Sequence, residues 1–155
     1  MPFQFCNVDL DIRSSAPLDD IASHFASFGD RVFPLYCGVY DGGSYFAAFE
    51  IHWDEAKFPD DEDGNPTMPE HWGPWERIEA FCELIRALHG TALDRWNSAT
   101  ARVFDLGYES DDHCQPLRVT VPSRILKLAI DVGAEIAFTI YPKSFGDEPA
   151  DTTST

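Results

Sequence analysis

The densest cluster of chemically active side chains in the sequence is an acidic stretch bounded by Pro59 and Pro66. Carboxylates at alternate positions around a glycine are typical of a calcium-binding loop, with the glycine sixth and a glutamate twelfth. Gly64 as the sixth residue makes Glu70 the twelfth, but the first is then Pro59, which has no carboxylate. Three interpretations stay open: a calcium site, a solvated charged loop, and an acidic surface for a basic partner.

Two tryptophans follow the acidic stretch in the run His71-Trp72-Gly73-Pro74-Trp75. Trp75 is expected to hold the following helix against the core. Trp72 lies outside the helical pattern, so it is either an exposed anchor for a protein partner or a cover for the loop. The candidate partner-binding residues are therefore Asp60, Asp61, Glu62, Asp63, Glu70, His71, Trp72, Asp111 and Asp112.

Other chemistries have weaker support in the sequence. The histidines show no His-x-x-x-His or His-Glu-x-x-His spacing, and the neighbours in Asp112-His113-Cys114 rarely converge on one metal ion. Gly42-Gly43-Ser44 joins two expected strands, whereas a nucleophile elbow joins a strand to a helix. No glycine-rich phosphate loop precedes a helix. We therefore predict no catalytic residues, no metal site, no cofactor and no enzymatic activity.

Composition narrows the class of partner. The chain has 155 residues, of which 27 are acidic and 11 basic, giving a net charge of −16. Nucleic acid and anionic membranes both attract cationic surfaces, so we expect neither as a partner. The longest apolar runs are shorter than the roughly 20 residues of a membrane-spanning helix. The start of the chain has no basic and apolar leader pattern, and its four cysteines are widely separated, so we expect free thiols and a cytoplasmic protein.

The first half of the chain predicts one helix between three strands. Residues 3–13 form a strand in which Val8, Leu10 and Ile12 face inward, and a change of phase near Cys6-Asn7 predicts a bulge. A helix then runs from Pro17 to Phe28 and ends at Gly29. Two further strands, 31–40 and 44–53, are joined by a glycine turn into an antiparallel hairpin. The side chains expected on the inner face of the second of these are Tyr45, Ala47, Phe49, Ile51 and Trp53.

The second half begins with a proline-rich loop over residues 54–74. Helical spacing of apolar residues predicts a helix over 75–89, broken at Gly90 and followed by a further turn or two. The remaining expected elements are a strand over 101–108, a strand over 117–121, a helix over 122–132 and a strand over 135–141. Residues 143–155 are polar, and we expect a disordered tail there.

This order of elements predicts a single α+β domain over residues 1–142, with 54–74 as an acidic insert. The expected sheet is largely antiparallel with helices on one face, built as a ferredoxin-like β-α-β-β-α-β core plus an appended β-α-β unit. Segments 10–36 and 119–141 share the plan strand, helix, glycine, strand, which is either an internal repeat or the ordinary form of β-α-β units. An exposed sheet edge allows a monomer or a homodimer.

Three segments carry a resemblance to a known family. The runs 116–129 and 133–141, together with Leu18-Asp19-Asp20-Ile21 after the first strand, resemble the domain-of-unknown-function 4279 family over residues 3–142. The insert from Asp54 to Pro74 departs from that family's pattern. The resemblance implies a small bacterial α+β protein. By analogy, it is also similar in character to bacterial immunity proteins, which are often small, acidic and without catalytic motifs.

The sequence therefore predicts a non-catalytic protein-binding module, such as an immunity protein or antagonist that blocks a basic toxin or effector. Residues 54–70 hold seven acids and one lysine, so a basic partner is first sought there. One alternative is a small enzyme or metal-binding protein with its site in the 54–74 loop. Another is a nucleic-acid mimic that inhibits a DNA-binding protein.

Overall fold

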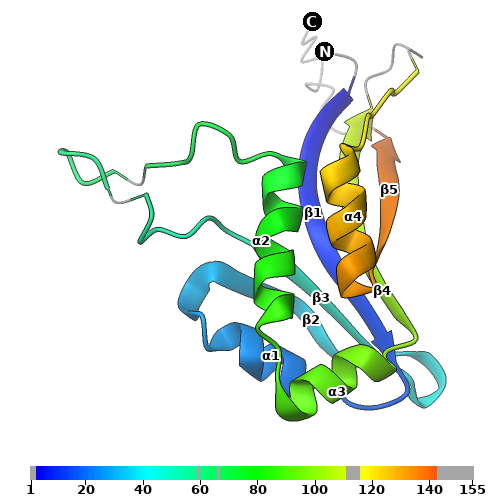
Figure 1. Ribbon diagram of the computed structural model, residues 1–155. Helices are drawn as coiled ribbons and strands as arrows, with labels where there is room; N and C mark the ends of the chain where they lie inside the picture. The colour runs from blue at the N-terminus through cyan, green and yellow to red at the C-terminus, as the bar shows by residue number, and fades with distance from the viewer. Residues whose placement is uncertain (1–2, 59, 66, 111–115, 143–155) are drawn as a thin grey trace, which may run out of the picture.

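A five-stranded sheet covered by four α-helices makes up the fold (Figure 1). The computed structural model describes residues 3–58, 60–65, 67–110 and 116–142. The strands are β1 (Phe3–Ser14), β2 (Val32–Val39), β3 (Tyr45–Ile51), β4 (Ala101–Ser110) and β5 (Glu135–Pro142). The helices are α1 (Asp19–Ala26), α2 (Pro74–Arg86), α3 (Gly90–Ser98) and α4 (Ser123–Val132), with short 3-10 turns η1 (Gly29–Arg31) and η2 (Asp41–Gly43).

The strands lie in the order β2-β3-β1-β4-β5. Every neighbouring pair is antiparallel except β4 and β5, which run parallel because α4 carries the chain back between them. The prediction of an α+β domain with a largely antiparallel sheet is confirmed. The finer ferredoxin-like assignment stays a prediction.

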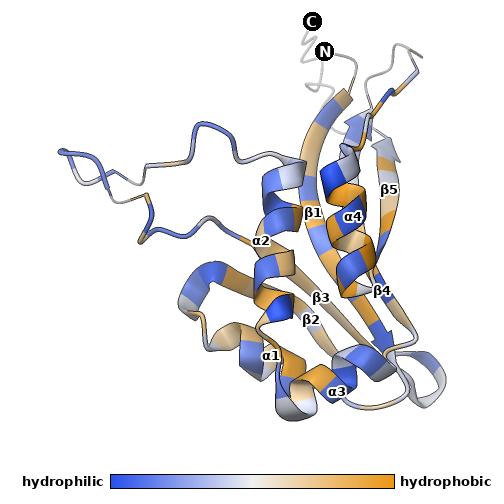
Figure 2. Cartoon of the chain, viewed as in Figure 1, coloured by the Kyte–Doolittle hydropathy of each residue, from blue (hydrophilic) through white to orange (hydrophobic). Residues whose placement is uncertain are grey.

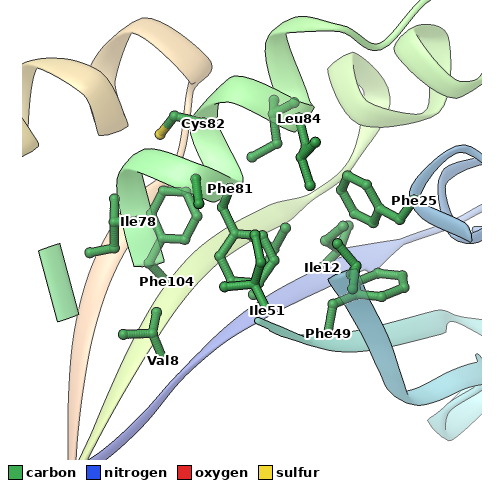
Figure 3. Close-up of a cluster of buried hydrophobic side chains, with 14 of the residues drawn as sticks. Val8, Ile12, Phe25, Phe49, Ile51, Ile78, Phe81, Cys82, Leu84 and Phe104 are labelled. Carbon is green, nitrogen blue, oxygen red and sulfur yellow. The ribbon is translucent and has the colours of Figure 1, made fainter. Parts of the chain in front are cut away.

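The hydrophobic core lies between one face of the sheet and the helices. Alternate residues of the central strands, among them Val8, Leu10 and Phe49, are buried with side chains from all four α-helices. Aromatic rings interlock there: Phe25 meets Phe49 edge to face at 5.0 Å between ring centres (Figure 3). Figure 2 shows that α2 and α4 each carry both apolar and polar residues, as expected of helices that bury one face against the sheet. The opposite face of the sheet has no helix from the described residues against it.

The central strand and the hairpin follow their predicted patterns. The register of β1 against β4 shifts between Phe5 and Asn7, which confirms the bulge. Strands β2 and β3 pair as an antiparallel hairpin. Gly42 and Gly43 in its turn have φ angles of 63° and 84°, a region that favours glycine. The predicted inner-face residues Ala47, Phe49 and Ile51 are all buried.

The helix after the acidic loop begins and ends earlier than predicted. It starts at Pro74, where the backbone N–H of Gly73 donates a 3.0 Å hydrogen bond to Oε2 of Glu76, and it ends at Arg86. Gly90 was expected to break this helix, and its φ of 56° turns the chain directly into α3. This segment is a full helix, where only one or two turns were expected.

The predicted strand over residues 117–121 is wrong. Strand β4 already pairs with β1 on one side and β5 on the other, so no ladder position is open beside it. The segment has no regular secondary structure, and Leu117, Val119 and Val121 pack against the core. That packing explains the alternating pattern. Without this strand the segment 119–141 does not repeat the plan of 10–36, so the internal repeat is also wrong.

Candidate protein-binding surface

The loop that joins β3 to α2, called here the acidic loop, projects away from the sheet and helices (Figure 1). Asp60, Asp61, Glu62 and Asp63 are all exposed in its outer part. The carboxylate of Asp61 accepts hydrogen bonds from the backbone N–H groups of Asn65 (2.8 Å) and Asp63 (3.0 Å), which lowers its pKa. This carboxylate therefore organises the loop's own turn. Among the described residues, no three His, Cys, Asp or Glu side chains converge as metal ligands.

Trp72 lies at the base of this loop and is not an exposed anchor. It is half-buried and packs against the core, with its ring edge-on to that of Trp53 at 6.4 Å. The guanidinium of Arg77 sits over the Trp72 ring at 5.9 Å. Of the two interpretations of Trp72, the structure supports the loop cover. Trp75, as expected, is also packed against the core.

The remaining predicted partner-binding residues do not form one cluster with the outer loop. Glu70 and His71 are exposed at the loop's return to α2, several residues along the chain from Asp60–Asp63. Asp111 and Asp112 lie outside the described residues. The carboxylates of Asp60–Asp63 and that of Glu70 therefore occupy two separate positions along the acidic loop.

A stronger concentration of carboxylates lies on the sheet face opposite the helices, called here the open face. Asp9 in β1 is directly opposite Glu50 in β3 and Asp105 in β4. These three residues form the acidic row across three adjacent strands. Asp11 adds a fourth carboxylate on the same face, two residues along β1. Opposed residues in antiparallel strands have Cβ atoms about 5 Å apart, so the carboxylates of the row are close neighbours.

The electrostatics of the acidic row are unfavourable in the isolated protein. Burial, together with the charges of Asp11, Glu50 and Asp105, raises the pKa of Asp9 to about 6. Burial and the charge of Asp105 also raise the pKa of Asp11. The ion pairs of the described residues involve Arg86, Arg95 and Arg124 on the helices, and none involves the acidic row. Like charges opposite each other destabilise a sheet, so this row costs stability that a cationic partner would restore.

Polar neighbours hold the acidic row in place. Nδ2 of Asn7 donates a 3.0 Å hydrogen bond to Asp9, and Oγ1 of Thr139 donates to both carboxylate oxygens of Asp105 at 2.7 and 2.9 Å. Gly107 leaves the space for Asn7, because a Cβ at that position would collide with the Asn7 side chain. Three strands thus contribute residues that fix the orientation of the carboxylates.

Aromatic side chains flank the acidic row on the β2 side. The group called here the aromatic edge consists of Phe33, Tyr36, Tyr40 and Phe46. Tyr36 stacks on Phe46 at 6.0 Å, and the guanidinium of Arg13 lies 5.5 Å from the Tyr40 ring centre. Tyr36 and Tyr40 remain about half exposed, at 45% and 53%. Large aromatic side chains beside charges are typical of residues that dominate protein–protein binding.

A pocket of about 530 Å³ lies where the aromatic edge meets the base of the acidic loop. Its walls include Phe28 after α1, Phe33 in β2 and Trp53 after β3. Phe33 is directly opposite Glu50, so one wall of the pocket lies beside the acidic row. The order along the open face is pocket, Glu50, Asp9 and Asp105.

The acidic row is not among the candidate residues predicted from the sequence. Period-2 alternation predicts Asp9 and Asp11 on the outer side of the strand over 3–13 and Glu50 on the outer side of the strand over 44–53, and the structure confirms these positions. Their proximity depends on the pairing of β1 with both β3 and β4, and one sequence does not specify that register. The available signal was the run of acidic residues at outward positions of several strands.

Comparisons with known proteins give no relative for this chain. No protein-family model matches it, and neither a curated protein nor a solved structure does. The resemblance to the domain-of-unknown-function 4279 family stays a prediction. None of the helices in the described part of the chain has the length and apolar character needed to cross a membrane.

Proposed function

We propose that this protein is a non-catalytic binding module that blocks a basic protein by docking it on the open face, as a bacterial immunity protein blocks a toxin. One observation carries the proposal: the acidic row lies beside the aromatic edge on a sheet face without a covering helix from the described residues. The compartment we propose for this interaction is the cytoplasm.

The chemistry of the open face fits a lysine- or arginine-rich partner. Burial and repulsion together raise the pKa of Asp9, and a cation placed against Asp9 and Asp105 relieves the repulsion. The half-exposed rings of Tyr36 and Tyr40 supply contact area at low cost in side-chain entropy. The carboxylates attract and orient a basic partner, and the aromatic rings beside them add to its affinity.

The acidic loop has a different role in this proposal. Its exposed carboxylates attract a basic partner at long range, as does the net charge of −16. Because Trp72 is held against the core, the loop lacks the exposed aromatic anchor that was one of the two interpretations of this residue. We therefore assign the loop to steering and the open face to docking.

Capture from cells of the source organism tests the proposal with three baits. These are the unmodified chain, an open-face variant (Asp9→Asn with Asp105→Asn), and a loop variant (Asp60→Asn, Asp61→Asn and Asp63→Asn). The expected result is a protein of net positive charge that the unmodified chain and loop variant retain and the open-face variant loses. Co-expression should also relieve the toxicity of that protein. Equal retention by all three baits would remove the open face from the account, and absence of any basic protein would contradict the proposal.

A small-molecule site is the second candidate, favoured by the pocket at the base of the acidic loop. Its volume of about 530 Å³ lies within the range typical of ligand pockets. The sequence suggested a small enzyme or metal-binding protein with its site in the 54–74 loop, and of that loop Asp54, Glu55 and Ala56 line this pocket. A stoichiometric small molecule released from purified protein on denaturation, identified by mass spectrometry, would favour it over the binding module.

A further inference from the structure

The pocket beside the acidic row has aromatic walls that contact one another. The ring of Phe33 meets that of His52 edge-on at 4.8 Å, and His52 lies 6.1 Å from the adjoining ring of Trp53. Phe28 completes this wall from the end of α1, and both Phe28 and Phe33 are partly exposed, at 38% and 43%. The face of an aromatic ring is electron-rich and binds cations, so a guest cation is favoured where it lies over one of these faces.

The charged residues of the pocket also favour a cation. Asp30, Asp54 and Glu55 line it, and Arg31 is the one basic residue among the lining side chains of the described chain. The lining therefore carries three negative charges against one positive charge. Glu50 of the acidic row adds a further carboxylate beside Phe33. An anionic guest would meet this surplus of negative charge as well as the −16 of the whole chain.

Two residues of the pocket wall carry buried donors that lack an acceptor. Nε of Arg31 and Nε1 of Trp53 are buried without a hydrogen-bond partner among the described residues. Both atoms lie beneath the surface of the pocket, so a guest's oxygen atom accepts from them only when the Arg31 or Trp53 side chain turns toward it. Leaving such a group unpaired is costly, so a guest that brings an oxygen atom favours that turn and is favoured over one that does not. A simple alkylammonium ion has no acceptor. A lysine or arginine residue within a polypeptide has a cationic end and backbone carbonyl oxygens at the other end of the same side chain.

We propose that this pocket receives one lysine or arginine residue of the basic partner, with its cation among the aromatic and acidic walls and a backbone carbonyl facing Arg31 and Trp53. This inference rests on the proposed function and adds a specific anchor to it. The neighbouring acidic row then binds the positive charges that follow on the same segment. The pocket sets the register of the partner on the open face.

Nuclear magnetic resonance of the full chain tests the pocket with defined probes. The probes are N-acetyl-lysine N-methylamide, N-acetyl-arginine N-methylamide, butylamine, which lacks the carbonyl groups, and N-acetyl-glutamate N-methylamide, which has the opposite charge. The capped lysine or arginine should shift the indole N–H signal of Trp53 in a saturable way. Butylamine should bind about fivefold more weakly, and the glutamate compound should leave the signal unchanged.

Variants separate the pocket from the rest of the open face. Phe33→Ala and Glu55→Gln should each weaken binding of the capped lysine or arginine about fivefold. Leu35→Ala is the matched control, because it removes an exposed apolar side chain from the same strand outside both the pocket and the aromatic edge, and it should leave this binding unchanged. An unchanged affinity in both Phe33→Ala and Glu55→Gln would overturn the inference.

A longer probe distinguishes failure of this inference from failure of the proposed function. A capped peptide of alternating lysine and alanine should shift the amide signals of Asp9, Glu50 and Asp105 together with the Trp53 indole. Shifts in the acidic row without the indole would overturn the pocket and support docking on the open face. Shifts of the indole by butylamine as strongly as by the capped residues would overturn the polypeptide ligand in favour of a free amine.

Discussion

Asp9 is the residue on which the electrostatics of the open face converge. Burial raises its pKa, and so do the charges of Glu50 and Asp105, which lie directly opposite it on the neighbouring strands, while Asn7 holds its carboxylate in place. Its folded-state pKa of about 6 exceeds the value in an unfolded chain. Between these two values the folded protein binds more protons than the unfolded one, so the free energy of unfolding falls as pH rises from about 4 to 6.

Asp9→Asn should therefore stabilise the protein at pH 7. We expect a gain of about 1 kcal/mol in the free energy of unfolding, a discounted figure because the carboxylate is only half-buried. At pH 4, where Asp9 is protonated in the folded state and partly so in the unfolded chain, the gain should shrink to near zero. Urea denaturation at the two pH values measures it. Asp63→Asn, in the exposed loop, is the control and should change stability by less than about 0.5 kcal/mol at either pH. A destabilised Asp9→Asn protein at pH 7 would contradict this account.

Gly107 is the residue that makes room for the polar support of the row. Gly107→Ala places a methyl group against Asn7 and the ring of Tyr141, and we expect a loss of about 1–3 kcal/mol in stability. Asn7→Ala in the same chain removes the main obstacle, so the double variant should be more stable than the sum of the single effects predicts. Strict additivity in the denaturation data would show that Gly107 and Asn7 do not meet.

Single residues of the site were only partly predictable from the sequence. The outward positions of Asp9, Asp11 and Glu50 follow from period-2 alternation, and the structure confirms them. The neighbours of Asp9 do not follow, because register depends on tertiary pairing. Trp72 had two possible environments, and only the packing of Trp53 and Arg77 around it distinguishes them.

Among the larger elements, the loop before α2 combines two parts with different physical roles. Its outer part is exposed and makes mostly local hydrogen bonds, such as those between Asp61 and Asn65. Its return carries Trp72, which packs against the core. The outer part is therefore dispensable for folding, whereas the return stabilises the start of α2.

Replacing residues 57–68 with a short Gly/Ser linker should change stability by less than about 1 kcal/mol, because closure entropy depends weakly on loop length. It should slow association with the basic partner and leave the dissociation rate unchanged. Trp72→Ala should instead cost about 2 kcal/mol through lost packing. Thermal denaturation and surface plasmon resonance measure both effects. A collapse of stability on shortening the loop would contradict the division into two parts.

Helices and strands were predictable where the spacing of apolar residues in the sequence has a single physical cause. The amphipathic spacing within α2 and the alternation in β1 each reflect burial of one face against the core, and both elements exist. The segment 117–121 shows where this logic fails. Its alternate residues are half-buried against the core, but the sheet has no ladder position beside β4, so the same pattern arises without a strand.

At the scale of the whole molecule, charge is distributed unevenly between the two sides of the sheet. The ion pairs of the described residues join α2 to α4 and α3 to α1. On the open face, Arg13 lies over aromatic rings and no ion pair of the described residues reaches the acidic row. The charge of Arg77 attracts Glu50 and Asp9, and that of Arg13 attracts Asp11, but the raised pKa of Asp9 shows that burial and repulsion outweigh these attractions on the face proposed for docking.

Salt should stabilise the unbound protein. Because added ions screen repulsion among 27 acidic residues, we expect the melting temperature at pH 7 to rise between 0.01 and 0.5 M sodium chloride. In Asp9→Asn with Asp105→Asn the rise should be smaller. A melting temperature that falls with sodium chloride would show that ion pairs, rather than repulsion, dominate the electrostatics.

The affinity of the captured basic protein for matched variants tests the central claim most directly. Calorimetry at one moderate salt concentration compares the unmodified chain with Asp9→Asn plus Asp105→Asn, and with the triple loop variant at Asp60, Asp61 and Asp63. We predict that the open-face variant weakens binding by at least about tenfold, because it removes charges at the docking surface, while the loop variant weakens it by less than about threefold. The reverse order would contradict the account and return the binding site to the acidic loop.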